Sequence, residues 1–358
     1  MKILYGVQGT GQGHISRARA MAEAFRSHDV EVSWLFSGRP REKLFDMEPF
    51  GHYSHRRGLT FSTCAGRLNR LDTLRENDFR RFFSDIKQLD LSGFDLVVTD
   101  YEPVVAWAAR RARVRSIGIG HQYAFGPTTP VSGGDVISRM IMRWFAPVDC
   151  PVGLHWHPYA YNVLPPILDL PDATPSRVEH KYGHILVYLP FEDQQAVTRL
   201  LQQLPGHRFV QYANGLAQEI AGNVLRKPTS ITTFKNDLRA STGVICNAGF
   251  ELISECLQWG KPVLTRPLTG QMEQLSNARA LQQLGYAAVI PQLAVAPIEN
   301  WLNSHSTNSS LGFPDVASAL ARWLGEGANE GLADLWHELW DRSHHANTAP
   351  LSLSALSS

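Results

Sequence analysis

The chain has 358 residues, of which 44% are apolar and 19% are charged, with 34 Lys and Arg against 33 Asp and Glu. This length predicts two domains, and the balanced charge excludes a protein that binds nucleic acid through bulk positive charge. Four scattered cysteines without a CxxC pair exclude a disulfide framework, and no apolar run reaches the roughly 18–20 residues of a membrane-spanning helix, so a cytoplasmic protein is expected.

The first half of the chain alternates short apolar runs with amphipathic patterns. Residues 2–7 predict a strand, 9–13 a loop, and the residues that follow predict a helix with one apolar face. Further strands are predicted at 30–36, 94–99 and 116–120, and a helix at about 104–111. Strands that alternate with helices predict a parallel sheet with right-handed crossovers.

The proline-rich segment PPILDLPDATP at 165–175 indicates a linker, and a second alternating series follows it. Its predicted strands are 184–189, 207–212, 243–246 and 262–265, and its predicted helices are 196–204, 250–258, 277–284 and 332–342. We therefore expect an α/β protein with two doubly wound, Rossmann-like domains whose parallel sheets face each other across a ligand-binding cleft.

The expected domain boundaries follow from the same patterns. Residues 1–166 form the first domain, 167–179 the linker and 180–330 the second domain. Residues 331–345 are expected to form a helix that can pack back onto the first domain, and 346–358 a disordered tail.

The first predicted strand leads into the loop GTGQGH at 9–14. Glycines let the backbone turn sharply and let a ligand approach the start of the next helix. A nicotinamide dinucleotide site fits poorly, because His14 stands where G-x-G-x-x-G needs its third glycine, and a P-loop fails because no Gly-Lys-Ser/Thr follows. Gly11, Gln12 and Gly13 are instead expected to form a loop that lines the cleft on the side of the first domain.

His14 is the distinctive residue of this loop. It falls in the first turn of the predicted helix, where the positive end of the helix dipole favours a neutral ring that can accept a proton. Asp100 follows a predicted strand and could orient the ring as the acid of a catalytic triad does. The alternatives are that His14 only packs the loop and that Asp100 only caps the next helix. Glu102 is a weaker candidate partner.

The second cluster begins at Asn247 with NAGFELISECLQWGKP and continues with PLTGQMEQ at 267–274. Free backbone N–H groups at the start of the predicted helix can bind a diphosphate without a metal. Glu255 could accept hydrogen bonds from ribose hydroxyls, and Glu273 with Gln274 could hold a sugar, since hydroxyls both donate and accept. Glu251 is expected on the solvated face of the helix.

These motifs resemble nucleotide-sugar glycosyltransferases of the GT-B fold. GTGQGH and FxLISExLxxGKPxLxxPLxGQxEQxxNA carry the resemblance, which spans about residues 2–284. The chain resembles a bacterial and archaeal group within this fold, and it is more distantly similar to the GlcNAc transferase that forms lipid II and to UDP-glycosyltransferases of small molecules. One departure is CNAG at 246–249, where the small-molecule enzymes have His-Cys-Gly-Trp.

The resemblance implies a metal-independent, inverting transfer of a sugar, hexosyl or N-acetylhexosaminyl, from a nucleotide sugar to a hydroxyl acceptor. The expected donor is a UDP-sugar, and no other cofactor is expected. His14 is implied as the general base and Asp100 as its supporting acid. The residues implied on the donor side are Phe234 near the base, Asn247, Ala248, Gly249 and Phe250 at the diphosphate, Glu255 at the ribose, and Gln271, Glu273 and Gln274 near the sugar.

Two other functions stay open, a UDP-sugar 2-epimerase of the same fold and a non-catalytic nucleotide-sugar-binding protein. No nucleic-acid partner is expected, and no oligomeric state is predicted. Arginines in the first hundred residues are expected on solvated helix faces, and the apolar run at 140–145 is expected in the core. The alternative is that both contact the inner membrane face peripherally. His155 and His157, on one face of an expected strand, lack a third ligand, so no metal site is predicted.

Overall fold

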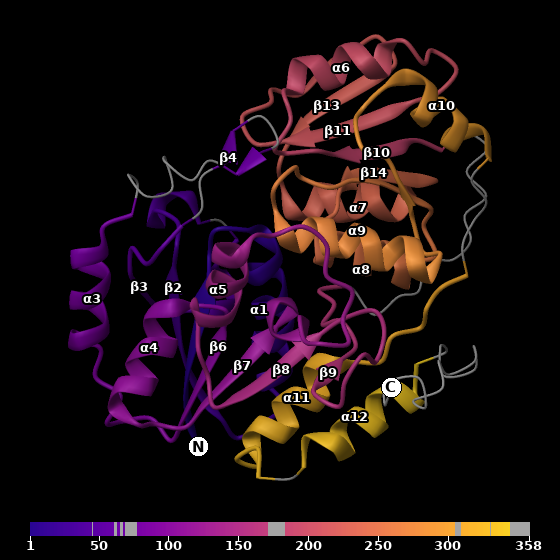
Figure 1. Ribbon diagram of the computed structural model, residues 1–358. Helices are drawn as coiled ribbons and strands as arrows, with labels where there is room; N and C mark the ends of the chain where they lie inside the picture. Colours follow the sequence, from indigo (N-terminus) through magenta and orange to yellow (C-terminus); the bar gives the residue numbers. More distant parts are fainter. Residues whose placement is uncertain are drawn as a thin grey trace.

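The computed structural model describes residues 1–44, 46–60, 63–64, 67–68, 77–170, 183–304, 309–329 and 331–343. Within these ranges the chain forms two α/β halves, each built around a mainly parallel sheet, as predicted (Figure 1). The predicted linker lies partly outside the described residues, and the predicted tail lies wholly outside them.

The first sheet has the strand order β3-β2-β1-β6-β7-β8-β9, and all its neighbouring strands pair in parallel. Its strands are β1 (Lys2–Gln8), β2 (Glu31–Ser37), β3 (Tyr53–His55), β6 (Leu96–Asp100), β7 (Ser116–Gly120), β8 (Cys150–Leu154) and β9 (Val163–Leu164). The order reverses between β1 and β6. The carboxyl ends of these two strands therefore form the switch point at which open α/β sheets bind ligands.

Helices cover both faces of the first sheet. They are α1 (Gln12–Phe25), α3 (Phe79–Gln88), α4 (Pro103–Ala112), α5 (Val136–Trp144), α11 (Val316–Gly325) and α12 (Leu332–Asp341). Successive strand residues point to opposite faces. Ile3 and Tyr5 of β1 thus join the core that includes residues of α1, α11 and α12, while Leu4 joins the core with α3 and α4.

The last two helices return to the first half of the molecule, as Figure 1 shows in yellow. α11 packs along α1, and the indole nitrogen of Trp340 on α12 donates a hydrogen bond of 2.8 Å to the carbonyl oxygen of Val163. These contacts tie the end of the chain to the first sheet.

The second sheet has the order β12-β13-β11-β10-β14-β15-β16 and is parallel except for the β12–β13 pair. Its strands are β10 (Ile185–Tyr188), β11 (Phe209–Ala213), β12 (Glu219–Ala221), β13 (Val224–Pro228), β14 (Gly243–Asn247), β15 (Val263–Arg266) and β16 (Ala288–Val289). Its helices are α6 (Gln194–Gln202), α7 (Ile231–Ala240), α8 (Phe250–Gln258), α9 (Met272–Leu284) and α10 (Val295–Ser304). Residues of α6 and α10 join the core on one face of this sheet, and residues of α7, α8 and α9 join the core on its other face.

The predicted elements recur with small shifts in their bounds. The helix predicted at 250–258 is α8, whereas the helix predicted at 277–284 begins earlier, at Met272. Helices α3, α5, α7, α10 and α11 and several edge strands were not predicted. A short antiparallel pair, β4 (Thr63–Cys64) with β5 (Arg67–Leu68), adds to the first half. Across the described ranges, no helix has both the length and the apolar character needed to cross a membrane.

Candidate active site

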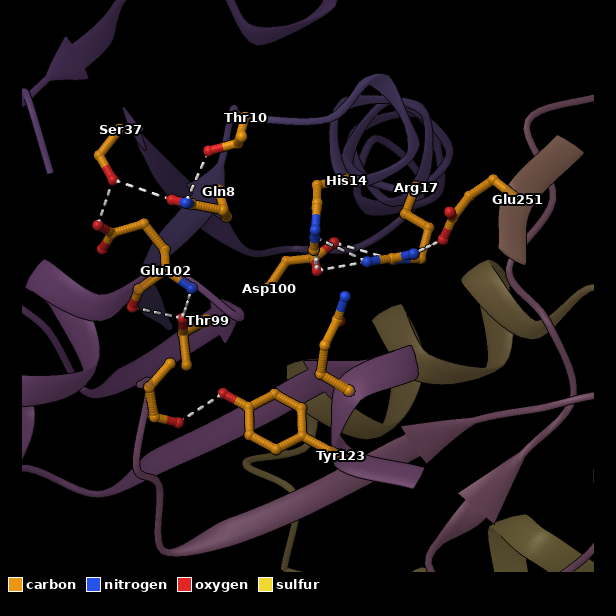
Figure 2. A network of polar contacts seen from close by, with 12 residues as sticks. Gln8, Thr10, His14, Arg17, Ser37, Thr99, Asp100, Glu102, Tyr123 and Glu251 are labelled. Carbon is orange, nitrogen blue, oxygen red and sulfur yellow. Dashed lines mark hydrogen bonds and ion pairs between the residues drawn. The ribbon is translucent and has the colours of Figure 1, made fainter. Parts of the chain in front are cut away.

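His14 and Asp100 meet at the switch point of the first sheet. β1 and β6 pair in parallel with Val7 opposite Asp100, which is the last residue of β6. The glycine loop after β1 brings His14 into the first turn of α1, and Nδ1 of its ring lies 2.7 Å from Oδ1 of Asp100 (Figure 2). The structure therefore brings together the two residues that the sequence singled out.

The hydrogen-bond pattern assigns the tautomer of His14. An ionised carboxylate only accepts hydrogen bonds, so Nδ1 donates its proton to Asp100. Nη2 of Arg17 also lies 2.9 Å from this nitrogen, but a protonated Nδ1 cannot accept from it. The nitrogen that can take up a proton is then Nε2. His14 lines the cleft, and its side chain is 14% exposed.

Arg17 is the residue of this site that sequence reasoning missed. It lies one turn after His14 on α1 and is almost fully buried. Its Nε donates to Oδ2 of Asp100 at 3.0 Å and its Nη2 to Oδ1 at 2.6 Å. Burial by itself would raise the pKa of Asp100, but the Arg17 guanidinium and the contact with His14 hold that pKa below its ordinary value. Asp100 is thus kept ionised beneath the imidazole.

Glu251, in the first turn of α8, also contacts Arg17, through Nη1 (Figure 2). The prediction that Glu251 lies on a solvated face was wrong, because the two halves approach each other closely here. A Cβ atom on Gly13 would lie only 2.2 Å from the Glu251 carboxylate, so this glycine lets α8 reach the loop. The ion pair links the His14–Asp100 pair to the helix of the other half.

Glu102 supports the loop rather than His14. Its carboxylate caps α4 by accepting hydrogen bonds from the backbone nitrogens of Val104 and Val105, and it also contacts Ser37 at 2.5 Å. Burial raises the pKa of Glu102 to about 7, although these hydrogen bonds oppose the rise. Figure 2 shows the network continuing from Ser37 through Gln8 to Thr10 of the glycine loop.

The start of α8 faces the same cleft from the second half. Gly249 is its N-cap and has no side chain to bond the first N–H groups, and a Cβ atom there would meet nothing within 4 Å. The backbone N–H groups of such a helix start bind anions. Gly249 and His14 line one cavity of about 1070 Å³ between the halves.

Three of the residues that the sequence assigned to a diphosphate site, Asn247, Ala248 and Phe250, have buried side chains. Asn247 and Ala248 are buried and are not among the residues that line the cavity. The Asn247 amide donates to the carbonyl oxygen of Arg266 at 3.0 Å, and the Ala248 carbonyl accepts from Asn277 at 2.9 Å. The ring of Phe250 is buried and stacks on His121 at 4.0 Å between centroids, so only its backbone is suited to a ligand.

Glu255 lines the cleft one turn and a half into α8 and forms an ion pair with Lys235 of α7. Burial raises the pKa of Glu255, and the Lys235 ammonium opposes that rise. Phe234 also lines the cleft and packs edge-on against Tyr188 and Tyr212, with centroids 5.3 and 5.1 Å away. The Lys235 contact was missed because nothing in the local sequence pairs two residues on different helices.

Gln271, Glu273 and Gln274 line the cleft at the start of α9. Gln271 is the N-cap residue, and the two others lie in the first turn of the helix rather than in the predicted loop, because α9 begins at Met272. Oε1 of Gln274 accepts from the backbone nitrogen of Leu268 at 2.9 Å. Oε2 of Glu273 accepts from the Gln122 amide of the first half at 3.1 Å.

The remaining predictions concern the loop and a metal. Gly11, Gln12 and Gly13 line the cavity, and both polar atoms of the Gln12 side chain are buried without a protein partner. His155 follows the end of β8 and is not part of a strand. Among the described residues, no group of three or more His, Cys, Asp or Glu is arranged to hold a metal ion.

Comparisons with solved structures agree with this architecture. The glycosyltransferase SsfS6 of Streptomyces sp. SF2575, solved with thymidine diphosphate, is similar with a TM-score of 0.57 and 16% identity over 95% of this chain and 96% of that one. The calicheamicin glycosyltransferase CalG4 is similar with a TM-score of 0.56 and 14% identity, over 98% of this chain and 99% of that one. MurG of Acinetobacter baumannii is similar with a TM-score of 0.54 and 17% identity, over 94% of this chain and 99% of that one. At these identities the likeness shows a shared fold, that of GT-B glycosyltransferases.

No protein in the curated set matches the chain significantly. The family model described as glycosyl transferase family 1 matches residues 1–305, which include both sheets and every candidate site residue. The chain belongs to glycosyl transferase family 1, and it is a glycosyltransferase.

Proposed function

We propose that this glycosyltransferase transfers a sugar from a nucleoside-diphosphate sugar, with UDP as the expected nucleoside diphosphate, to a hydroxyl acceptor with inversion at the anomeric carbon. The observation that carries the proposal is the imidazole of His14, hydrogen-bonded to a buried carboxylate, in the same cleft as the open start of α8. One half thus supplies a base and the other a site for an anion.

The chemistry follows from these two groups. Nε2 of His14 takes the proton of the acceptor hydroxyl as its oxygen attacks the anomeric carbon, and Asp100 stabilises the imidazolium that forms. The bond between the sugar and the diphosphate breaks at the same time, on the opposite face of that carbon. The negative charge that develops on the diphosphate is met by the backbone N–H groups in the first turn of α8, which begins at Phe250, and groups already positioned need little reorganisation.

Aspartate in place of Gly249 tests the diphosphate site. The new carboxylate would cap the first N–H groups of α8, and the space around Gly249 is open, so the protein should fold with equal or slightly greater stability. The same carboxylate occupies and repels the diphosphate position. We expect nucleoside-diphosphate binding, measured by calorimetry, to weaken at least about tenfold, as loss of one charged hydrogen bond would cause. Serine at 249 is the neutral control, and equal weakening by both variants would argue against an anion site.

Alanine in place of Glu255 tests the ribose assignment. Loss of hydrogen bonds to a charged group is expected to weaken nucleotide binding by about 1–3 kcal/mol. Calorimetry with a nucleoside diphosphate and with free diphosphate separates the causes, because only the nucleoside carries a ribose. The exposed Glu299 on α10 provides the matched control. Equal affinity of the Glu255→Ala protein for the nucleotide would contradict the assignment.

A thermal-shift screen of nucleotide sugars tests the proposal as a whole. A ligand at 100 times its Kd stabilises the folded protein by roughly 2.7 kcal/mol. The screen should include UDP- and dTDP-sugars, since a structural neighbour was solved with thymidine diphosphate. Release of the nucleoside diphosphate that requires an acceptor would support transfer, whereas release without one would favour a 2-epimerase. The 2.7 Å contact between His14 and Asp100 argues against a non-catalytic binding protein.

A further inference from the structure

One face of α1 presents polar side chains to the cleft. Gln12, Ser16 and Arg19 stand at positions i, i+4 and i+7 of this helix, a spacing that places them on one side, and all three line the cavity. The helix packs against α8 of the second half. The first half therefore borders the cleft with this row of polar side chains as well as with His14.

The guanidinium group of Arg19 is held through two of its nitrogens, while the third has no partner. Its Nε donates to Oδ2 of Asp169 at 3.1 Å, and its Nη2 donates to the hydroxyl of Ser16 at 3.4 Å. Ser16 in turn donates to the same oxygen of Asp169 at 3.0 Å. Nη1 is buried, and it has no hydrogen-bond partner in the part of the chain that the structure describes. A buried N–H group without an acceptor costs free energy, so a ligand that supplies one is favoured here.

α1 and α8 approach each other over successive turns. Near the starts of the two helices, a Cβ atom on Gly13 would meet the Glu251 carboxylate, with which Arg17 forms an ion pair. Glu255 lies one turn further along α8. Burial raises the pKa of Glu255, and Arg19 is among the positive charges that oppose this rise. The side of α1 that carries Arg19 is therefore close to the residue proposed at the ribose.

The charges around Glu255 balance one another. Lys235 and Arg19 are cations, and they pair with the carboxylates of Glu255 and Asp169, respectively. These four side chains together carry no net charge to attract a phosphate, and the unpartnered N–H of Arg19 instead suits a neutral oxygen. A hydroxyl provides one, because its oxygen accepts a hydrogen bond while its proton is donated to a carboxylate. The two neighbouring hydroxyls of a ribose can therefore satisfy Glu255 and Arg19 together.

On these grounds, and resting on the proposed function, we propose that Arg19 binds the ribose of the donor nucleotide from the first half of the molecule, opposite Glu255. Nη1 of Arg19 donates to the oxygen of one ribose hydroxyl, and the hydroxyls donate to the Glu255 carboxylate. The site then selects a ribonucleoside diphosphate over a deoxyribonucleoside diphosphate, because a missing hydroxyl leaves a buried N–H group or carboxylate oxygen without its partner.

Calorimetry with UDP, 2′-deoxy-UDP and 3′-deoxy-UDP tests this inference. The unmodified protein is expected to bind UDP at least about tenfold more tightly than either deoxy analogue, which is the effect of one hydrogen bond to a charged group. Arg19→Lys keeps a positive charge beside Asp169 but removes the Nη1 donor. This variant should bind UDP at least about tenfold more weakly than the unmodified protein does. Its affinity for one of the two deoxy analogues should stay within a factor of about two, since that analogue lacks the hydroxyl that Arg19 contacts.

Arg26→Lys is the matched control, because Arg26, the C-cap residue of the same helix, is exposed and does not line the cleft. It should leave all three affinities unchanged. Equal weakening of all three nucleotides by Arg19→Lys would overturn the inference, and equal weakening of free diphosphate as well would show a contact with the phosphates instead. Binding of UDP no tighter than that of 2′-deoxy-UDP by the unmodified protein would also overturn it. The proposed function itself would fail only if no nucleotide sugar bound the unmodified protein.

Steady-state kinetics with a UDP-sugar add a second readout. Arg19→Lys should raise KM for the donor at least about tenfold and leave kcat within a factor of about two, because the ribose contact is the same in the ground and transition states. A fall in kcat at unchanged KM would contradict a binding role for Arg19.

Discussion

Replacement of His14 by alanine is expected to lower kcat at least a hundredfold while leaving the affinity for the donor almost unchanged. General bases contribute about 10²–10⁴ to the rate, and the proposed donor site consists of residues of α8 and α9 that line the cleft from the other half. The ring of His14 forms a hydrogen bond with Asp100, and His14 lies on α1 rather than on α8 or α9. Steady-state kinetics together with calorimetry of nucleotide binding measure the two quantities separately.

His52 offers a matched control, because it is an exposed histidine that does not line the cleft. His52→Ala should leave kcat unchanged. Unchanged turnover in His14→Ala would remove this residue from the mechanism. A loss of donor affinity as large as the loss of turnover would instead indicate that His14 holds the cleft together.

Replacement of Arg17 by methionine should destabilise the protein by about 3–5 kcal/mol, which is the usual effect of removing one partner from a buried ion pair. Arg17 is 2% exposed and Asp100 is 0% exposed, so water cannot take over the lost contacts. The substitution leaves the carboxylates of Asp100 and Glu251 without their common cation. Chemical denaturation at neutral pH measures the change in the free energy of unfolding.

The pH dependence of that change identifies its cause. In the unmodified protein the pKa of Asp100 is lowered, so its contribution to stability is present above the unfolded pKa and is lost as the pH falls through the folded one. Without Arg17, burial dominates and raises the folded pKa, so the contribution reverses sign. The difference between the two proteins should therefore be largest at neutral pH, shrink as the pH falls toward about 4, and shrink further below the unfolded pKa, where the unmodified protein loses its own stabilisation.

Glu251→Gln is the control for Arg17, since it removes only the partner across the cleft and keeps the Arg17–Asp100 pair. It should cost much less stability, because the Glu251 side chain is 20% exposed. A destabilisation by Arg17→Met that did not vary with pH would argue that lost packing, rather than the charge of Asp100, is responsible.

The general architecture could be predicted from the sequence because its signals are local. Apolar strands that alternate with amphipathic helices predicted two parallel sheets, and α8 was predicted with the bounds that it has. The unpredicted helices α3 and α5 have exposed aromatic or apolar side chains, such as Phe83 and Met140. In these two helices the positions of apolar residues therefore do not mark the buried face, and the periodicity of the sequence does not reveal the helix. α10 and α11 lie late in the chain, where no motif marked them.

The sequence alone indicated which residues of the glycine loop and of α8 line the cleft, because turns and helix starts depend on neighbours in the chain. Only the tertiary structure decided the electrostatics of the site. Arg17 meets Asp100 across 83 positions in the sequence, and Lys235 meets Glu255 from another helix. Glu251, which local periodicity assigns to solvent, is instead opposite Arg17, because charges are paired by distance in space and burial, neither of which the order of residues specifies.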